Sequence, residues 1–116
     1  MRHHNANRKF GRETDGRRAL LRSLAEGLLE HGKITTTEAK AKELRPFIEK
    51  LITKARTPSV GTRRLLSSRL GTQARMESLI AAVAKKYQEQ AGGYTRIIKI
   101  PKRISDGSPM AIIELL

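Results

Sequence analysis

The amino-acid sequence predicts an α+β protein, a two-layer α/β fold in which helices cover a small three-stranded sheet. Apolar residues recur at helical spacing in several separated segments, and short segments rich in β-branched residues lie between and after them. Aromatic residues make up only 3% of the chain, so an aliphatic core is expected. The expected order is α-β-α-α-α-β-β, preceded by a basic N-terminal extension. At 116 residues, the chain has the length of one domain.

The first helix is expected to begin near Asp15, a residue type that caps helix N-termini well. Leucine and alanine then recur at helical spacing from Leu20 to Leu29. Gly32 provides a stop, because glycine adopts the left-handed conformation at the end of a helix without a Cβ penalty. The segment KITTT that follows, residues 33–37, predicts a short strand from its β-branched residues.

A second helix follows this strand. Thr35 and Glu38 have the spacing of a capping box, which would start the helix. An apolar stripe with a period close to 3.6 residues runs from Leu44 to Ala55. Pro46 lies inside this stripe, and because proline removes one backbone hydrogen bond, we expect a kink there or a break just before it.

Two shorter helices are expected in the middle of the chain. The segment TPSVG, residues 57–61, has the composition of a turn, and a third helix is predicted from about Arg63 to Leu70, ending at Gly71. Thr72 can cap a fourth helix with an apolar buried side, and Gly92–Gly93 would stop it.

The C-terminal part of the chain predicts a hairpin. Residues 94–100 and 110–116 read as strands, and the basic loop between them contains an Asp106–Gly107 turn. Because a two-stranded sheet is only marginally stable, the KITTT strand is expected to join it, with the helices covering one face.

Charge is the strongest signal in the composition. The chain has 24 Lys and Arg against 11 Asp and Glu, for a formal net charge of +13. Such an excess destabilises a compact fold by self-repulsion, so an anionic partner is expected, nucleic acid first. The chain has no cysteine and no apolar run long enough to span a membrane, so we expect no disulfide, thiolate metal site or membrane partner. The N-terminus lacks a secretory apolar segment, and Glu13 and Asp15 argue against a transit peptide.

Catalytic and metal-binding chemistry find little support. His3 and His4 are adjacent and therefore diverge, and His31 is far from both in the sequence. The acidic residues are interleaved with basic ones, so no carboxylate pair stands apart as a general acid and base. Gly92–Gly93 is not followed by the lysine and hydroxyl residue of a phosphate loop. We expect no enzyme activity, catalytic residue, cofactor, metal or small-molecule substrate.

The positive charges fall into groups along the chain, the first of which is an N-terminal arm, residues 1–12, ahead of a globular body, residues 13–116. The arm group, extended into the first helix, contains five arginines and one lysine, and the planar arginine side chain suits bidentate phosphate contact. Further groups lie on the second helix, the short helices and the hairpin. Lys50, Lys54, Lys85 and Lys86 are interpreted as part of a solvated face.

The shortage of aromatic residues favours one kind of nucleic-acid recognition. Stacking of single-stranded bases needs exposed aromatic rings, and only Phe10 and Tyr94 are plausible. Recognition of the backbone and shape of a folded RNA is therefore favoured. An architectural DNA-binding protein is the alternative. The Gly71 junction resembles a helix-turn-helix turn, yet the following helix is apolar and is expected to be a core helix.

Four strings in the sequence resemble one family. They are MRH with RKFGR shortly after it, ITTTEAKAKELR, GGYTRI and MAIIEL, and they resemble the bacterial ribosomal large-subunit protein L17 family. The resemblance spans nearly the whole chain. It implies the same two-layer fold and a structural role in translation, in the large subunit of the cytoplasmic ribosome. It also implies binding to large-subunit ribosomal RNA, with ribosomal protein L32 as a neighbour.

The resemblance further implies RNA-binding residues at the matching positions: Arg2, His3, Arg8, Lys9, Gly11, Arg12, Thr36, Thr37, Lys40, Lys42, Tyr94, Thr95 and Arg96. Charge and hydrogen-bonding capacity add His4, Arg17, Arg18, Arg63, Arg64, Lys102 and Arg103 to this set. Two departures from the family pattern are small: Phe10 replaces the usual leucine, and the stretch 57–62 lacks a Gly-Asp-Leu-His run.

Overall fold

The computed structural model describes residues 14–90 and 92–116. Its elements are α1 (Thr14–His31), β1 (Lys33–Thr37), α2 (Glu38–Ala55), α3 (Val60–Leu70), α4 (Gln73–Lys86), β2 (Thr95–Ile100) and β3 (Met110–Leu115). The order and the α+β class confirm the prediction from the sequence. The predicted end of α1 and both bounds of β1 are confirmed, and Gly32 ends α1 with a φ of 81°. The predicted cap at Asp15 is wrong, because α1 already includes Thr14 and Asp15 lies in its first turn.

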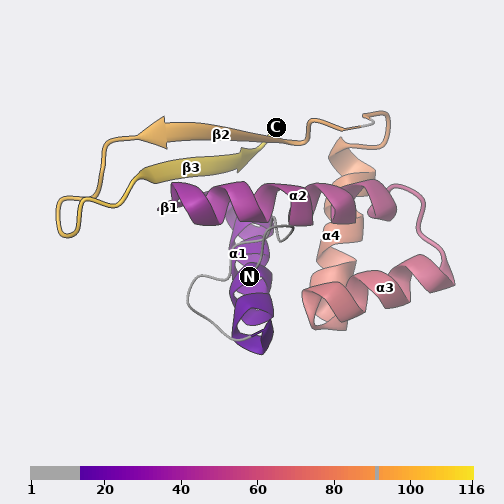
Figure 1. The fold of residues 1–116 in the computed structure, drawn as a ribbon. Coiled ribbons are helices and arrows are strands. Elements are labelled where there is room, and N and C mark those ends of the chain that lie inside the picture. The colour runs from indigo at the N-terminus through magenta and orange to yellow at the C-terminus, as the bar shows by residue number, and fades with distance from the viewer. Residues whose placement is uncertain (1–13, 91) are drawn as a thin grey trace, which may run out of the picture.

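The three strands form one antiparallel sheet in the order β1-β3-β2, so the KITTT strand joins the hairpin as predicted. Thr36 of β1 pairs with Ala111 of β3, and Ile97 of β2 pairs with Ile113 of β3. Thr36, Ala111 and Ile113 are buried, which places them on the helix-covered face. Figure 1 shows α2 running along this face and the β2–β3 hairpin projecting beyond the helices.

The core is largely aliphatic, with two tyrosines added. Leu44 and Ile48 of α2 and Leu79 of α4 are fully buried in one common core. Tyr87 and Tyr94 are also buried, and their rings meet edge to face with centroids 5.3 Å apart. Such an arrangement adds to the stability gained from area burial alone.

The capping box predicted at Thr35 is wrong. Thr35 lies inside β1, paired with Ile112, and the N-cap of α2 is Thr37, whose hydroxyl accepts a hydrogen bond from the backbone N–H of Lys40 at 3.3 Å. The strand continues two residues further than the capping box allows. The helix that follows is continuous through Pro46, so the break considered before that residue does not occur.

The two shorter helices differ from the prediction at one end each. Ser59 caps α3 by accepting a hydrogen bond from the backbone N–H of Thr62 at 3.1 Å, so the helix begins at Val60 and includes part of the predicted turn. Thr72 caps α4 as predicted. The end of α4 is not at Gly92–Gly93 but at Lys86, because the next residue, Tyr87, leaves the helical conformation. Its ring is buried, and its hydroxyl donates to the carbonyl oxygen of Leu116 at 2.8 Å.

Candidate nucleic-acid interface

The loop between β2 and β3 is held by a network inside the loop. The Arg103 guanidinium donates to both carboxylate oxygens of Asp106, at 3.0 and 2.9 Å. The backbone N–H of Ser108 donates to the same carboxylate at 3.0 Å, and that of Gly107 donates to the Arg103 carbonyl oxygen at 2.7 Å. Hydrogen bonds from Arg103, then from Ser108, hold the pKa of Asp106 well below its usual value. The loop is therefore a preformed turn.

This turn engages one predicted cation and leaves another exposed. The charge of Arg103 is paired within the loop, whereas Lys102 is exposed and has no ion pair within residues 14–90 and 92–116. Ile104 is fully exposed beside them. Lys102 is thus the hairpin residue that is best placed to meet an anion.

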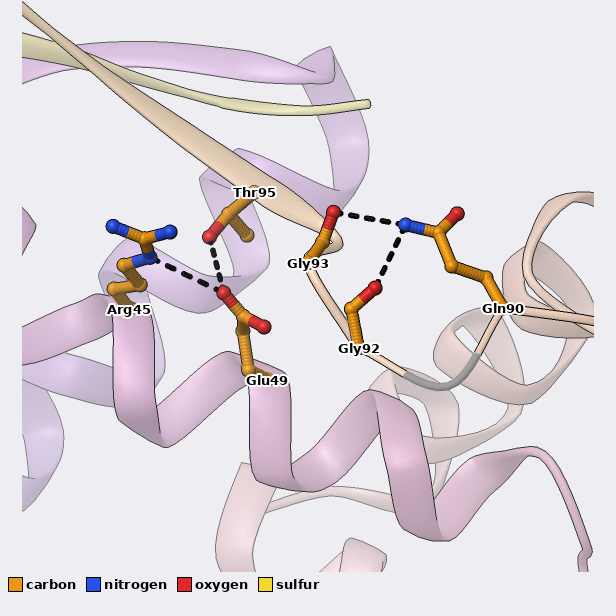
Figure 2. Close-up of polar contacts among 6 residues, drawn as sticks. All are labelled: Arg45, Glu49, Gln90, Gly92, Gly93 and Thr95. Carbon is orange, nitrogen blue, oxygen red and sulfur yellow. Dashed lines mark hydrogen bonds and ion pairs between the residues drawn. The ribbon is translucent and has the colours of Figure 1, made fainter.

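A polar cluster fixes the start of β2 to α2 (Figure 2). The Thr95 hydroxyl donates to a carboxylate oxygen of Glu49 at 2.7 Å, and Arg45 Nε donates to the same oxygen at 3.2 Å. Partial burial raises the pKa of Glu49, but hydrogen bonds from Thr95, Arg45 and the Tyr94 backbone lower it further, and the net result is a pKa below the usual value. The carboxylate is therefore stabilised in its ionised form.

The chain before β2 is held in a similar way. The Gln90 side-chain amide donates to the carbonyl oxygens of Gly92 and Gly93, both at 2.8 Å (Figure 2). The Tyr94 hydroxyl donates to the Gln90 carbonyl oxygen at 3.0 Å and lies 3.1 Å from the Thr53 hydroxyl. The GGYT segment is thus a closed turn against α2.

Three residues of the predicted RNA-binding set are buried in the body. Tyr94 is 0% exposed, Thr95 3% and Thr36 9%. Each has a role within the body: Tyr94 and Thr95 bond to α2 and to the preceding turn, and Thr36 lies on the covered face of the sheet. Their direct contact with RNA stays a prediction.

Other predicted residues are engaged in hydrogen bonds or ion pairs at the surface. Thr37 caps α2, and its hydroxyl accepts a hydrogen bond from the backbone N–H of Lys40 in the first turn of that helix. Lys42 pairs with Glu38 at 2.8 Å, and Arg96 pairs across the strands with Glu114. The Lys42 and Arg96 charges are exposed but already neutralised.

Four further predicted residues on the helices carry charges without an acidic partner among the described residues. Arg17 and Arg18 on α1 and Arg63 and Arg64 on α3 form no ion pair in the part of the chain that the structure describes. Arg18, Arg63 and Arg64 are exposed, and Arg17 is half-buried. The arm residues Arg2, His3, His4, Arg8, Lys9, Gly11 and Arg12 lie outside the described residues.

The structure also brings together cations that the sequence does not connect. A groove of about 630 Å³ between α1, α2 and α3 is lined by Arg17 and Arg18 together with Lys50 and Lys54. The sequence predicts that both lysines belong to a solvated face. Helical spacing places them on one side of α2, but nothing in the sequence shows that this side meets α1 and α3.

The described residues give no support for a metal site, a membrane-spanning helix or a DNA-reading helix. Within residues 14–90 and 92–116 there is no cluster of His, Cys, Asp or Glu that could hold a metal ion. No helix in this part of the chain is long and apolar enough to cross a membrane. α4, which follows the Gly71 turn, buries Met76, Leu79 and Val83, so the prediction of a core helix is confirmed.

Fold and surface together define a small, strongly basic α+β protein whose conspicuous feature is an excess of surface cations. A model of the family described as Ribosomal protein L17 matches residues 20–116. The chain therefore belongs to the ribosomal protein L17 family. It is 50% identical to a protein of Gemmatimonas aurantiaca named "Large ribosomal subunit protein bL17", over all of this chain and 98% of the relative. Proteins of the same name from Neorickettsia sennetsu and Thermomicrobium roseum are 47% and 46% identical over all of this chain, covering 100% and 99% of those relatives.

Proposed function

We propose that this chain is a structural constituent of the large subunit of the cytoplasmic ribosome, where it binds folded large-subunit ribosomal RNA. The observation that carries the proposal is the full-length match to relatives that are named large ribosomal subunit proteins. The net charge of +13 supports an RNA partner, because RNA phosphates would neutralise the self-repulsion of the fold. The protein takes part in translation by supporting subunit structure, not by catalysis.

In this mechanism the chain has two parts. Residues 1–12 form a basic arm that contacts RNA, and residues 13–116 form a body that docks as a rigid block. In the body, Arg17, Arg18, Arg63, Arg64 and Lys102 contact phosphates, since no acidic residue among those the structure describes forms an ion pair with them. Tyr94, Thr95 and Thr36 act through the shape of the body, because their side chains are buried.

The salt dependence of RNA binding tests this function. If about 6–10 phosphates are contacted, affinity for a fragment of large-subunit ribosomal RNA falls by about three to five decades between 50 and 200 mM salt. A nearly flat dependence would contradict the proposal. Competition with duplex DNA separates it from the alternative of an architectural DNA-binding protein: the RNA fragment should compete far better than a duplex of equal length.

A protein neighbour belongs to the same proposal, and the family resemblance implies that this neighbour is ribosomal protein L32. Exposed apolar side chains on the hairpin side support a protein contact: Ile98 is 42% exposed and Leu116 is 43% exposed. Apolar surface of this kind gains stability when a partner covers it. The test is chemical cross-linking in assembled large subunits through an Ile98→Cys variant, which should join this chain to L32.

A further inference from the structure

The groove between α1, α2 and α3 gathers cations from three helices. Six of its lining residues are basic: Arg17, Arg18, Arg22, Lys50, Lys54 and Arg69. They are far apart in the sequence, and Glu43 is the acidic residue among the described residues that line the groove. Lys50, Lys54 and Arg69 are exposed and form no ion pair with any described residue.

The groove is a preformed part of the body. Arg22 donates from Nε to the Arg69 carbonyl oxygen at 3.1 Å and from Nη2 to the Ser68 carbonyl oxygen at 3.0 Å. These bonds tie α1 to the end of α3 and so set the width of the groove. They use neutral acceptors, which leave the positive charge of Arg22 uncompensated. The lining also includes Phe47 and Leu51, which give the groove apolar surface beside its cations.

We propose that this groove is a second RNA-binding site, separate from the arm, which takes one strand of the sugar–phosphate backbone of ribosomal RNA. The inference rests on the proposed function and adds a location to it. The six cations favour the phosphates of an RNA backbone, and the apolar residues of the lining suit the less polar faces of the sugars. Arg17 and Arg18 lie within the first turns of α1 and contribute cations to the groove.

Two other occupants fit the groove less well. The N-terminal arm of the chain itself carries Arg2, Arg8, Lys9 and Arg12 and no acid within residues 1–12, so its charge has the same sign as that of the groove. An acidic peptide has the right sign but a lower and less regular charge density than RNA. Binding of polyglutamate is therefore measured as part of the test.

The first test compares two double variants of the full-length chain with equal charge loss. Lys50→Gln/Lys54→Gln removes two cations from the groove, and Lys85→Gln/Lys86→Gln removes two exposed lysines from the end of α4. Binding of a ribosomal RNA fragment is titrated at several salt concentrations, and thermal denaturation confirms that both variants fold. We expect the groove variant to bind the RNA fragment about tenfold more weakly than the wild type. Its slope of log affinity against log salt concentration should be shallower by about one to two. The control variant should lose less than about twofold in affinity.

Equal losses in the two variants, with steep salt dependence in the wild type, would overturn the groove site and leave the proposed function standing. Failure of the wild type to bind RNA would overturn both. Polyglutamate that binds the wild type as tightly as RNA does, and loses this affinity in the groove variant alone, would show that the groove takes an acidic peptide instead.

A second test locates the RNA directly. The chain has no cysteine, so Ser68→Cys in the groove and Ser78→Cys on α4 each offer a unique attachment point for an iron–EDTA probe. The Ser68 contact with Arg22 uses the backbone carbonyl and is kept in the variant. We expect the Ser68 probe to cleave a short continuous RNA segment at least fivefold more strongly than the Ser78 probe does. Cleavage of equal strength and position from both sites would contradict the proposal.

Discussion

Thr95, in the GGYT segment, contributes to the stability of the fold through a hydrogen bond within the body. Its hydroxyl is buried and donates to Glu49. Thr95→Val keeps the side-chain shape but removes this bond, and should cost about 1–2 kcal/mol in the free energy of unfolding at neutral pH. Urea denaturation measures the loss.

The same variant has a defined pH dependence. The pKa of Glu49 is lowered in the folded state, so its stabilisation is present above the pKa of the unfolded chain and is lost as the pH falls through the folded value. The stability gap between wild type and Thr95→Val should therefore shrink below about pH 4. Thr53→Val, which removes a hydroxyl beside Tyr94 and no carboxylate contact, is the control and should show a constant gap. A gap that widens in acid would contradict the role assigned to Glu49.

Gly71 and Gly61 give a matched pair of substitutions on one helix. Gly71 ends α3 with a φ of 95°, and a Cβ placed there would lie 3.2 Å from the Cδ of Arg22. Gly71→Ala should therefore destabilise the fold by about 1–2 kcal/mol. Gly61 is inside α3 with open space around it, so Gly61→Ala should stabilise by about 0.5–1 kcal/mol. Thermal denaturation of the two variants checks that Gly71→Ala lowers the stability and that Gly61→Ala raises it.

At the level of helices and strands, the sequence predicts those features that a local residue pattern determines. Apolar periodicity is sufficient for all the helices, and β-branched residues are sufficient for the strands. Two of the errors lie at ends that a tertiary contact determines, whereas the start of α3 is set by the local cap at Ser59. α4 stops before Gly92–Gly93 because burial of Tyr87 draws the chain out of the helix. α2 is capped by Thr37 and starts at Glu38 because pairing with β3 extends β1 past Thr35. The burial of Tyr94 and the groove could not be predicted either, since both depend on how α2 meets distant segments.

The corrected start of α2 is testable by comparing two neighbouring threonines. Thr37→Ala removes the N-cap and should cost about 1 kcal/mol. Thr35→Ala affects only an exposed strand position and should cost about 0.5 kcal/mol from strand propensity. Urea denaturation distinguishes them, and a larger loss from Thr35→Ala would restore the capping box that the sequence predicts.

For the molecule as a whole, salt should act in opposite directions on folding and on binding. The net charge of +13 destabilises the free body by repulsion, and salt screens that repulsion. Salt also weakens the surface ion pairs such as Lys42–Glu38, but exposed pairs contribute little each. The repulsion should therefore dominate, and raising NaCl from 50 to 500 mM should raise the melting temperature of the free protein by about 3–6 °C.

The variant Lys85→Gln/Lys86→Gln tests the cause of this effect. It lowers the net charge by two from +13, so it should melt at a higher temperature than the wild type in low salt and gain less from added NaCl. Scanning calorimetry over a salt series measures both quantities. A melting temperature that falls with salt would show that ion pairs outweigh repulsion. The predicted rise, set beside an RNA affinity that falls over the same salt range, would show that the excess charge is a cost to the free fold that binding to RNA removes.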